Sequence, residues 1–406
     1  MWYNSKKGEY IGVDILFSLA LFFLCPALAI VSTISHIYRG KYGHLTILAL
    51  CISTVALFTP PFADIYRHTL LYFEFESHSY PIIQSNGHDY IFYTLTNIFA
   101  QNEIPFEFVS FIFVFVCYQI SFFIFYQVAT SWDARYWDKN KKFTIFLLFL
   151  LMVPFIAIIN GLRMATAAYI AFLAWYYIYN KRYFIGTLIY LISLATHFGS
   201  WIFLPTLLIP IIPHLKIDRQ KFIFISLGLF VAGGILLHIL PSSIIEMLEL
   251  EDKVTGYMEH NEERFDATMS VNGRIAMYLE RLPLVIVFIL ILFNRIKLDN
   301  RRKFIIYTII WLAILYHPFI VLFRRYAFFA IPLLVYIYID SQKGISRVDK
   351  VSKILLCACI IMTLSYVYGF RETFLNTHYH KMFFPSLYTI PSVDTHELFD
   401  DALIPK

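Results

Sequence analysis

Long apolar runs, separated by short polar segments, fill almost the whole chain. A membrane-spanning helix needs about 20 mostly apolar residues. Runs of this kind predict spans near 11–34, 45–62, 106–130, 143–160, 162–180, 222–240, 281–293, 304–321, 325–340 and 354–370. The pattern indicates an all-α polytopic integral membrane protein, with a single membrane domain over 1–370 and a tail over 371–406.

The apolar run from 183 to 213 is long for one span and short for two. It is interrupted at Thr196-His197-Phe198-Gly199-Ser200, which predicts two short helices that form either a broken span or a hairpin. With this pair the chain is predicted to have about 11–12 transmembrane helices, some of them short, broken or re-entrant. Residues 89–100 are amphipathic and too short to span, so we expect a helix in the head-group plane there.

The composition agrees with a membrane protein. The chain is 59% hydrophobic and 15% charged, whereas a soluble domain is about 45–50% apolar and about 25% charged. The five cysteines all fall in apolar runs, where they act as small buried hydrophobic residues. The sequence has no Gly-rich phosphate loop, no basic nucleic-acid stripe and no Cys/His cluster with metal-ligand spacing. We therefore expect no metal, no cofactor and no nucleic-acid partner.

The loop charges orient the chain. Six loops are basic, and basic loops stay in the cytoplasm: 36–44, 131–142, 180–182, 214–221, 294–303 and 340–353. The acidic or mixed loops 63–89 and 241–280 then lie outside, together with both termini, if the 183–213 run returns to the side that it left.

On this map the polar residues at the membrane boundary gather at the outer face. They come from six regions of the sequence: Asp64 and Arg67, Arg163, His197, Arg274, Glu280 and Arg281, and Arg324-Arg325. A charge inside a membrane segment costs roughly 2.5–3.5 kcal/mol on insertion scales, so such residues indicate function. The alternative is structural: Arg163 reaches the head groups and His197 hydrogen-bonds a neighbouring helix.

Several guanidinium groups at a membrane boundary suit one kind of ligand. Arginine matches the oxygens of phosphate or diphosphate with paired hydrogen bonds. A ligand with a lipid tail could enter between the helices and present a diphosphate head group to them. Arginine would then neutralise the charge that builds up on a departing diphosphate without a metal. A nearby His or carboxylate could take the proton from an attacking hydroxyl.

The stretch 160–205 resembles the signature of the EpsG-like, Wzy-type polysaccharide polymerases. In order, the matching residues are Arg163, Ala165, Ala168, Lys181-Arg182, His197, Ser200 and Pro205. A second match is Asp64-Ile65-Tyr66-Arg67. A third is Arg324-Arg325-Tyr326-Ala327-Phe328, which leads to Pro332.

The resemblance implies a GT-C-like glycosyltransferase that joins undecaprenyl-diphosphate-linked oligosaccharides at the periplasmic face of a bacterial inner membrane. The chain would use such lipids as both donor and acceptor and could work with a chain-length regulator. Its first outer loop lacks the acidic pair of many metal-dependent relatives, which favours a metal-independent reaction.

The resemblance also implies roles for individual residues. Arg163 and one of Arg324 and Arg325 would hold the diphosphate, and His197 would act as a base or as a hydrogen-bond donor to the diphosphate. Asp64 would orient the donor or the acceptor. The remaining candidates for sugar or diphosphate binding are Tyr66, Arg67, Arg274 and Glu280.

Two other function classes remain open. A flippase for the lipid-linked oligosaccharide would also hold a diphosphate with cations, but it should line a path through the membrane and contain internal repeats. A sugar O-acyltransferase would need a His that faces a cytoplasmic acyl donor, whereas the map places His197 outside.

Overall fold

The computed structural model describes residues 12–62, 64–77, 89–131, 137–212, 216–247, 275–276, 278–293, 295–296, 298–318, 320–342 and 349–400. Every regular element in these residues is a helix, which confirms the all-α prediction. Arg274, most of the predicted loop 241–280 and residues 63 and 78–88 of the loop 63–89 lie outside the described residues.

Four helical stretches are long and apolar enough to cross a membrane: Glu107–Thr130, Lys139–Asn160, Leu322–Ser341 and Lys350–Gly369. They correspond to α6 (Glu107–Ser131), to α7 (Lys139–Leu151) with α8 (Phe155–Asn160), to α17 (Ile320–Ser341) and to α18 (Lys350–Gly369). Shorter apolar helices accompany them. The chain is therefore a multi-pass membrane protein.

The predicted span 11–34 is instead two helices that pack against each other, α1 (Val13–Leu24) and α2 (Pro26–Tyr38). Cys25 between them has extended backbone angles. The reason is Pro26, which lacks an N–H and disfavours the helical conformation of the residue before it. The next predicted span, 45–62, is shorter than expected: α3 covers Leu45–Ala56.

The interrupted run 183–213 is broken where the sequence predicts it. α10 (Tyr183–Thr196) ends at His197, whose backbone is extended, and a 3-10 turn (Phe198–Phe203) leads into the short α11 (Leu204–Leu208).

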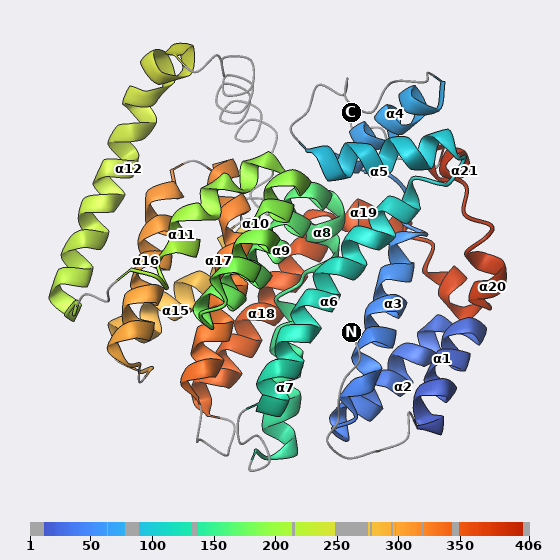
Figure 1. Cartoon of the computed structure of the whole chain (residues 1–406), viewed down its shortest axis with the longest axis horizontal. Helices are drawn as coiled ribbons and strands as arrows, with labels where there is room; N and C mark the ends of the chain where they lie inside the picture. The colour runs from blue at the N-terminus through green and yellow to red at the C-terminus, as the bar shows by residue number, and fades with distance from the viewer. Residues whose placement is uncertain are drawn as a thin grey trace.

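The core of the bundle is α9 (Leu162–Tyr179), which packs against α6, α10 and α17. Its small residues, among them Ala165, Ala168 and Ala171, are fully buried and allow neighbouring backbones to approach. One side of the bundle is completed by α12 (Arg219–Met247), α15 (Leu282–Leu292) and α16 (Asn300–Tyr316). In Figure 1, α12 forms one edge of the molecule and α1 and α2 lie near the opposite edge.

Two amphipathic helices lie across one end of the bundle, at the top of Figure 1: α4 (Asp64–Ser77) and α5 (Tyr90–Gln101). The second agrees with the short helix predicted over 89–100. The short helix α19 (Arg371–Asn376) contacts α18, from which it continues. The segments that follow it contact α1–α4: the 3-10 turn Tyr379–Phe383, α20 (Ser386–Thr389) and α21 (Thr395–Asp400).

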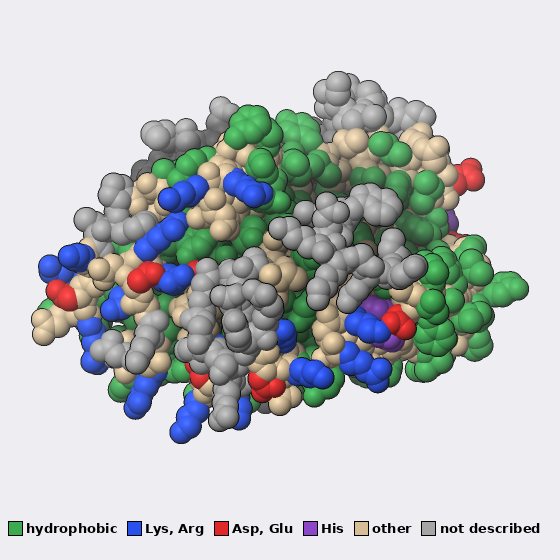
Figure 2. Space-filling model, turned by 60° about the horizontal axis from the view of Figure 1, so that its bottom comes forward, with side chains coloured by type: hydrophobic (Ala, Val, Ile, Leu, Met, Phe, Trp, Pro, Cys, Tyr) green, Lys and Arg blue, Asp and Glu red, His purple; other side chains and the backbone are tan. Residues whose placement is uncertain are grey.

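Lysines and arginines gather at the opposite end of the bundle. Figure 2 turns the bottom of Figure 1 toward the viewer and shows Lys and Arg side chains along this face, beside broad apolar sides. This is the face of the loops that the sequence predicts to be cytoplasmic.

Candidate active site

A single carboxylate, that of Asp89, joins two residues of the signature stretch, Arg163 and His197. Its Oδ2 lies 2.7 Å from Nη1 of Arg163. Its Oδ1 and Oδ2 lie 2.9 and 3.0 Å from Nδ1 of His197. The backbone N–H of Phe198 also donates to Oδ1, at 2.9 Å. Three donors from two separate segments thus converge on one acidic side chain.

Local structure explains how these three side chains come together. Asp89 directly precedes α5, where an Asp usually accepts from the first turn of its own helix. Its side chain makes no such capping bond and turns instead toward α9 and α10. Arg163 is the second residue of α9, and His197 is the residue at which α10 ends.

The site is largely shielded from water. Only 9% of the Asp89 side chain, 13% of that of His197 and 19% of that of Arg163 is exposed. Burial by itself would raise the pKa of Asp89. The hydrogen bond from His197, the positive charge of Arg163 and the N–H of Phe198 outweigh burial and hold this pKa below its ordinary value. Asp89 is therefore ionised at neutral pH.

Side chains of α4 and α5 surround the guanidinium group of Arg163. The guanidinium carbon lies 5.4 Å from the Phe92 ring centroid and 5.7 Å from that of Tyr93, and Nη1 donates to the Tyr93 hydroxyl at 3.0 Å. Arg163 also interacts electrostatically with Asp64. Aromatic faces and carboxylates together therefore fix the position of the guanidinium group.

Asp64 takes part in this network through α4. It forms an ion pair with Arg67, and its Oδ2 lies 3.3 Å from Nε2 of His68. Burial opposes its ionisation, but the contact with His68 and the charges of Arg67 and Arg163 keep its pKa well below the ordinary value. Burial and the charge of Arg163 also lower the pKa of His68.

The second imidazole nitrogen of His197 lies in the same region as Arg325. This nitrogen, Nε2, is buried and has no hydrogen-bond partner in the part of the chain that the structure describes. A Cβ added to Gly199 would lie 2.8 Å from this Nε2 and 3.5 Å from Nη1 of Arg325. Gly199 therefore leaves the space between the imidazole and the guanidinium open.

Comparison with known protein families assigns the chain to one of them. The model of the EpsG family matches residues 44–383. The chain belongs to the EpsG family. The matched range contains all the site residues above, and the family is linked to exopolysaccharide biosynthesis. No curated protein and no solved structure matches the chain.

In this EpsG-family chain the two adjacent arginines of α17 have different surroundings. Arg324 pairs with Glu280, with its Nη2 3.1 and 3.0 Å from the two carboxylate oxygens. Tyr366 of α18 also hydrogen-bonds Glu280. Arg281 is buried nearby, 4.5 Å from the Phe323 ring centroid. Glu280 and Arg324 thus form a buried pair, whereas Arg325 lies beside Gly199.

Two other predicted residues are placed differently. The ring of Tyr66 stacks on that of Phe399 in the C-terminal α21, with centroids 4.9 Å apart. Arg67 has 76% of its side chain exposed and is held by Asp64. The structure therefore brings Asp64, Arg163, His197 and Arg325 to one region, but it does not bring Tyr66 there.

Asp89 is a candidate site residue that the sequence analysis did not identify. It lies at the boundary between a polar loop and an amphipathic helix, where an ordinary helix cap explains an Asp equally well. Among the described residues, no group of three or more His, Cys, Asp or Glu side chains could hold a metal ion.

Proposed function

We propose that this protein is a repeat-unit polymerase, a glycosyltransferase that joins polyprenyl-diphosphate-linked oligosaccharides at the outer face of the membrane. The observation that supports the proposal best is the Asp89 carboxylate, which joins Arg163 to His197. The second imidazole nitrogen and Arg325 both lie beside Gly199. A base and two cations are thereby held at one membrane boundary.

The imidazole is arranged to accept a proton. A His that donates Nδ1–H to a carboxylate presents a lone pair at Nε2. His197 would take the proton of an acceptor-sugar hydroxyl at this atom. The hydroxyl oxygen attacks the anomeric carbon of the donor sugar and forms the new glycosidic bond. The bond from that carbon to the diphosphate oxygen breaks, and its electron pair leaves with the diphosphate.

The arginines would stabilise the leaving group. Charge builds up on the diphosphate as the bond breaks, and fixed guanidinium groups stabilise that charge without reorganising. Of the two α17 arginines, Arg325 lies beside Gly199 and close to the His197 imidazole, whereas Arg324 lies against Glu280. The contacts of Arg163 to Asp89 and Tyr93 both use Nη1, one of the three nitrogens that carry its five N–H donors. Asp64 would help to orient the sugar through the same network.

The side of the membrane on which the site lies is inferred from the loop charges. Basic loops favour the cytoplasm, which would place the Asp89 end of the bundle outside. The lipid carrier in a bacterial inner membrane would be undecaprenyl diphosphate, and a chain-length regulator would be a natural partner.

The proposal is tested in cells that lack this gene, complemented with wild type, Arg163→Ala, His197→Ala or the control Arg39→Gln, a substitution of an exposed arginine at the end of α2. Polymer length is read on a gel and membrane insertion by immunoblot. We expect wild type and the control to restore the polymer ladder, and both site variants to leave a single repeat unit on the final acceptor. Loss of even that unit, with lipid-linked repeat accumulating inside, indicates a flippase and contradicts the proposal.

A further inference from the structure

A second cationic site lies at the other end of α9. Arg163 is near the start of this helix and Tyr179 is its last residue. Sixteen residues of helix separate them, which is about 24 Å along the axis. That distance approaches the roughly 30 Å thickness of the hydrocarbon core. A group beside Tyr179 therefore lies at the head-group level opposite the candidate active site.

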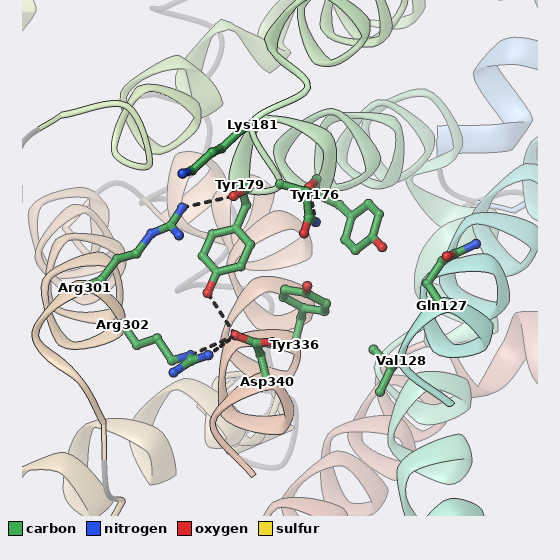
Figure 3. A pocket seen from close by; sticks show the side chains of 10 residues that line it. Gln127, Val128, Tyr176, Tyr179, Lys181, Arg301, Arg302, Tyr336 and Asp340 are labelled. Atoms are coloured by element: carbon green, nitrogen blue, oxygen red, sulfur yellow. Dashed lines mark hydrogen bonds and ion pairs between the residues drawn. The ribbon is translucent and has the colours of Figure 1, made fainter. Parts of the chain in front are cut away.

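A cavity of about 470 Å³ is present at this level, between α6, α9, α16 and α17. Figure 3 shows its lining, in which Lys181 and Arg301 point toward the same space beside Tyr179. The charged residues of the lining are Lys181, Arg301, Arg302 and Asp340, so three cations face one carboxylate.

One of these cations is already neutralised. Nε and Nη2 of Arg302 donate to Oδ2 of Asp340 at 2.8 and 2.6 Å. Nη1 of Arg302 lies 2.6 Å from Oδ2 of Asp299, and the Tyr179 hydroxyl donates to Asp340 at 2.9 Å. The carboxylate of the lining, that of Asp340, is thus paired with Arg302 and Tyr179.

The other two cations have no such partner. In the part of the chain that the structure describes, neither Lys181 nor Arg301 forms an ion pair. Arg301 donates from Nη2 to the backbone oxygen of Tyr179 at 3.0 Å, and its guanidinium carbon lies 4.4 Å from the Tyr179 ring centroid. Its Nε is buried and makes no hydrogen bond within the described residues. Two like charges that share a cavity repel each other, and an anion between them removes that repulsion.

The backbone at Lys181 is a second, independent observation. Lys181 has φ of 63°. It follows the α9 C-cap in a Schellman turn, in which the N–H of Lys181 donates to Ile178 and that of Arg182 to Tyr177, both at 2.9 Å. Glycine is the usual residue at this position because other residues are strained there. Lys181 occupies this strained position although glycine would not be strained there, and its side chain lines the cavity.

The position of Arg301 supports the same conclusion. It is the second residue of α16, and the positive end of the helix dipole disfavours a cation in the first turn. An anion would relieve this conflict as well. We propose that the cavity binds a phosphate group, supplied by an anionic phospholipid head group of the leaflet opposite the candidate active site.

The matched test compares Lys181→Gly with Lys221→Gln. Lys181→Gly removes the cation and relieves the backbone strain, so the variant should fold. Lys221 is an exposed lysine at the start of α12 that lies outside the cavity, and its substitution removes the same charge. The thermal unfolding of each full-length protein in neutral detergent is followed during titration with phosphatidylglycerol, phosphatidylcholine or inorganic phosphate. Arg301→Gln is a second cavity variant should Lys181→Gly unfold.

We expect phosphatidylglycerol to raise the unfolding temperature of wild type and of Lys221→Gln at the same lipid concentration. Loss of one charge-assisted contact should weaken the apparent affinity of Lys181→Gly about ten- to a hundredfold. Phosphatidylcholine should give no comparable stabilisation. If inorganic phosphate stabilises wild type but not Lys181→Gly, and the lipid adds nothing, the phosphate site stands but its ligand is soluble. Equal responses of all variants, or no response of wild type to either phosphate source, would overturn the proposal.

Discussion

Replacement of Asp89 by Asn tests the proposed mechanism most directly. The amide has nearly the same shape as the carboxylate, but it has no charge and only one oxygen to accept hydrogen bonds. It therefore cannot satisfy Arg163, His197 and the N–H of Phe198 together. The imidazole loses the partner that keeps the proton on Nδ1 and the lone pair on Nε2.

The structure sets the expected magnitudes. Removing the orienting carboxylate of a Ser-His-Asp triad in this way lowers turnover about 10⁴-fold, so we expect a loss of roughly 10³–10⁴-fold in polymerisation rate. Breaking a fully buried ion pair destabilises a protein by about 3–5 kcal/mol. Since 19% of the Arg163 side chain is exposed, solvent screens the loss, and the destabilisation should be about 2–3 kcal/mol.

The assay is the initial rate of polymer formation by purified protein with lipid-linked oligosaccharide as both donor and acceptor. Glu76→Gln is the matched control, because Glu76 is also paired with a histidine, His396 at 3.3 Å. The control should keep its rate within about twofold. Asp89→Asn combined with His197→Ala should be no slower than His197→Ala alone, since one function is lost only once. A folded Asp89→Asn protein with near wild-type rate would refute the mechanism.

Three further predictions follow from the geometry. Gly199→Ala should lower the polymerisation rate at least about tenfold without loss of insertion, because its Cβ would lie 2.8 Å from Nε2 of His197; an unchanged rate would contradict the placement of the acceptor there. Arg324→Gln should lower the free energy of unfolding by about 2–3 kcal/mol, because Glu280 stays buried without its ion-pair partner and the 25% exposure of Arg324 screens part of the loss. Arg325→Gln should chiefly lower the rate, so thermal unfolding and the rate assay separate the two variants. The pKa of Asp89 in the folded protein lies below its ordinary 3.8. The stability that ionised Asp89 contributes is therefore present above about pH 4 and is lost as pH falls through the lower folded pKa. Acid unfolding of Asp89→Asn should show less of this loss than wild type, and identical acid profiles would argue against the ion pair.

The placement of Arg163 and His197 could be predicted from the sequence. Hydrocarbon excludes charges, so an Arg at the mouth of one apolar run and a His within the next stand out without any alignment. The break at His197 could also be predicted, because the apolar run 183–213 is too long for a single span and is interrupted at this residue.

The partner of these residues could not be predicted. Asp89 is 74 residues from Arg163 and 108 from His197, and only the packing of α5 against α10 brings them together. The sequence also could not show which of Arg324 and Arg325 pairs with Glu280 and which lies beside Gly199. Neighbouring residues on a helix point about 100° apart, so one of them meets Glu280 and the other meets Gly199, and the sequence does not state the rotation of α17.

The burial of α9 explains why both cationic sites lie at its ends. Its 18 residues span about 27 Å, close to the thickness of the hydrocarbon core. Trp175, Tyr169 and the alanines of its middle are buried against α6, α10 and α17, so a charge placed there would meet neither water nor head groups. Cationic chemistry is thereby confined to the two boundaries, with Arg163 at one and Lys181 at the other. Because the middle of α9 is buried in the bundle, an anionic ligand can approach this helix only at its two ends.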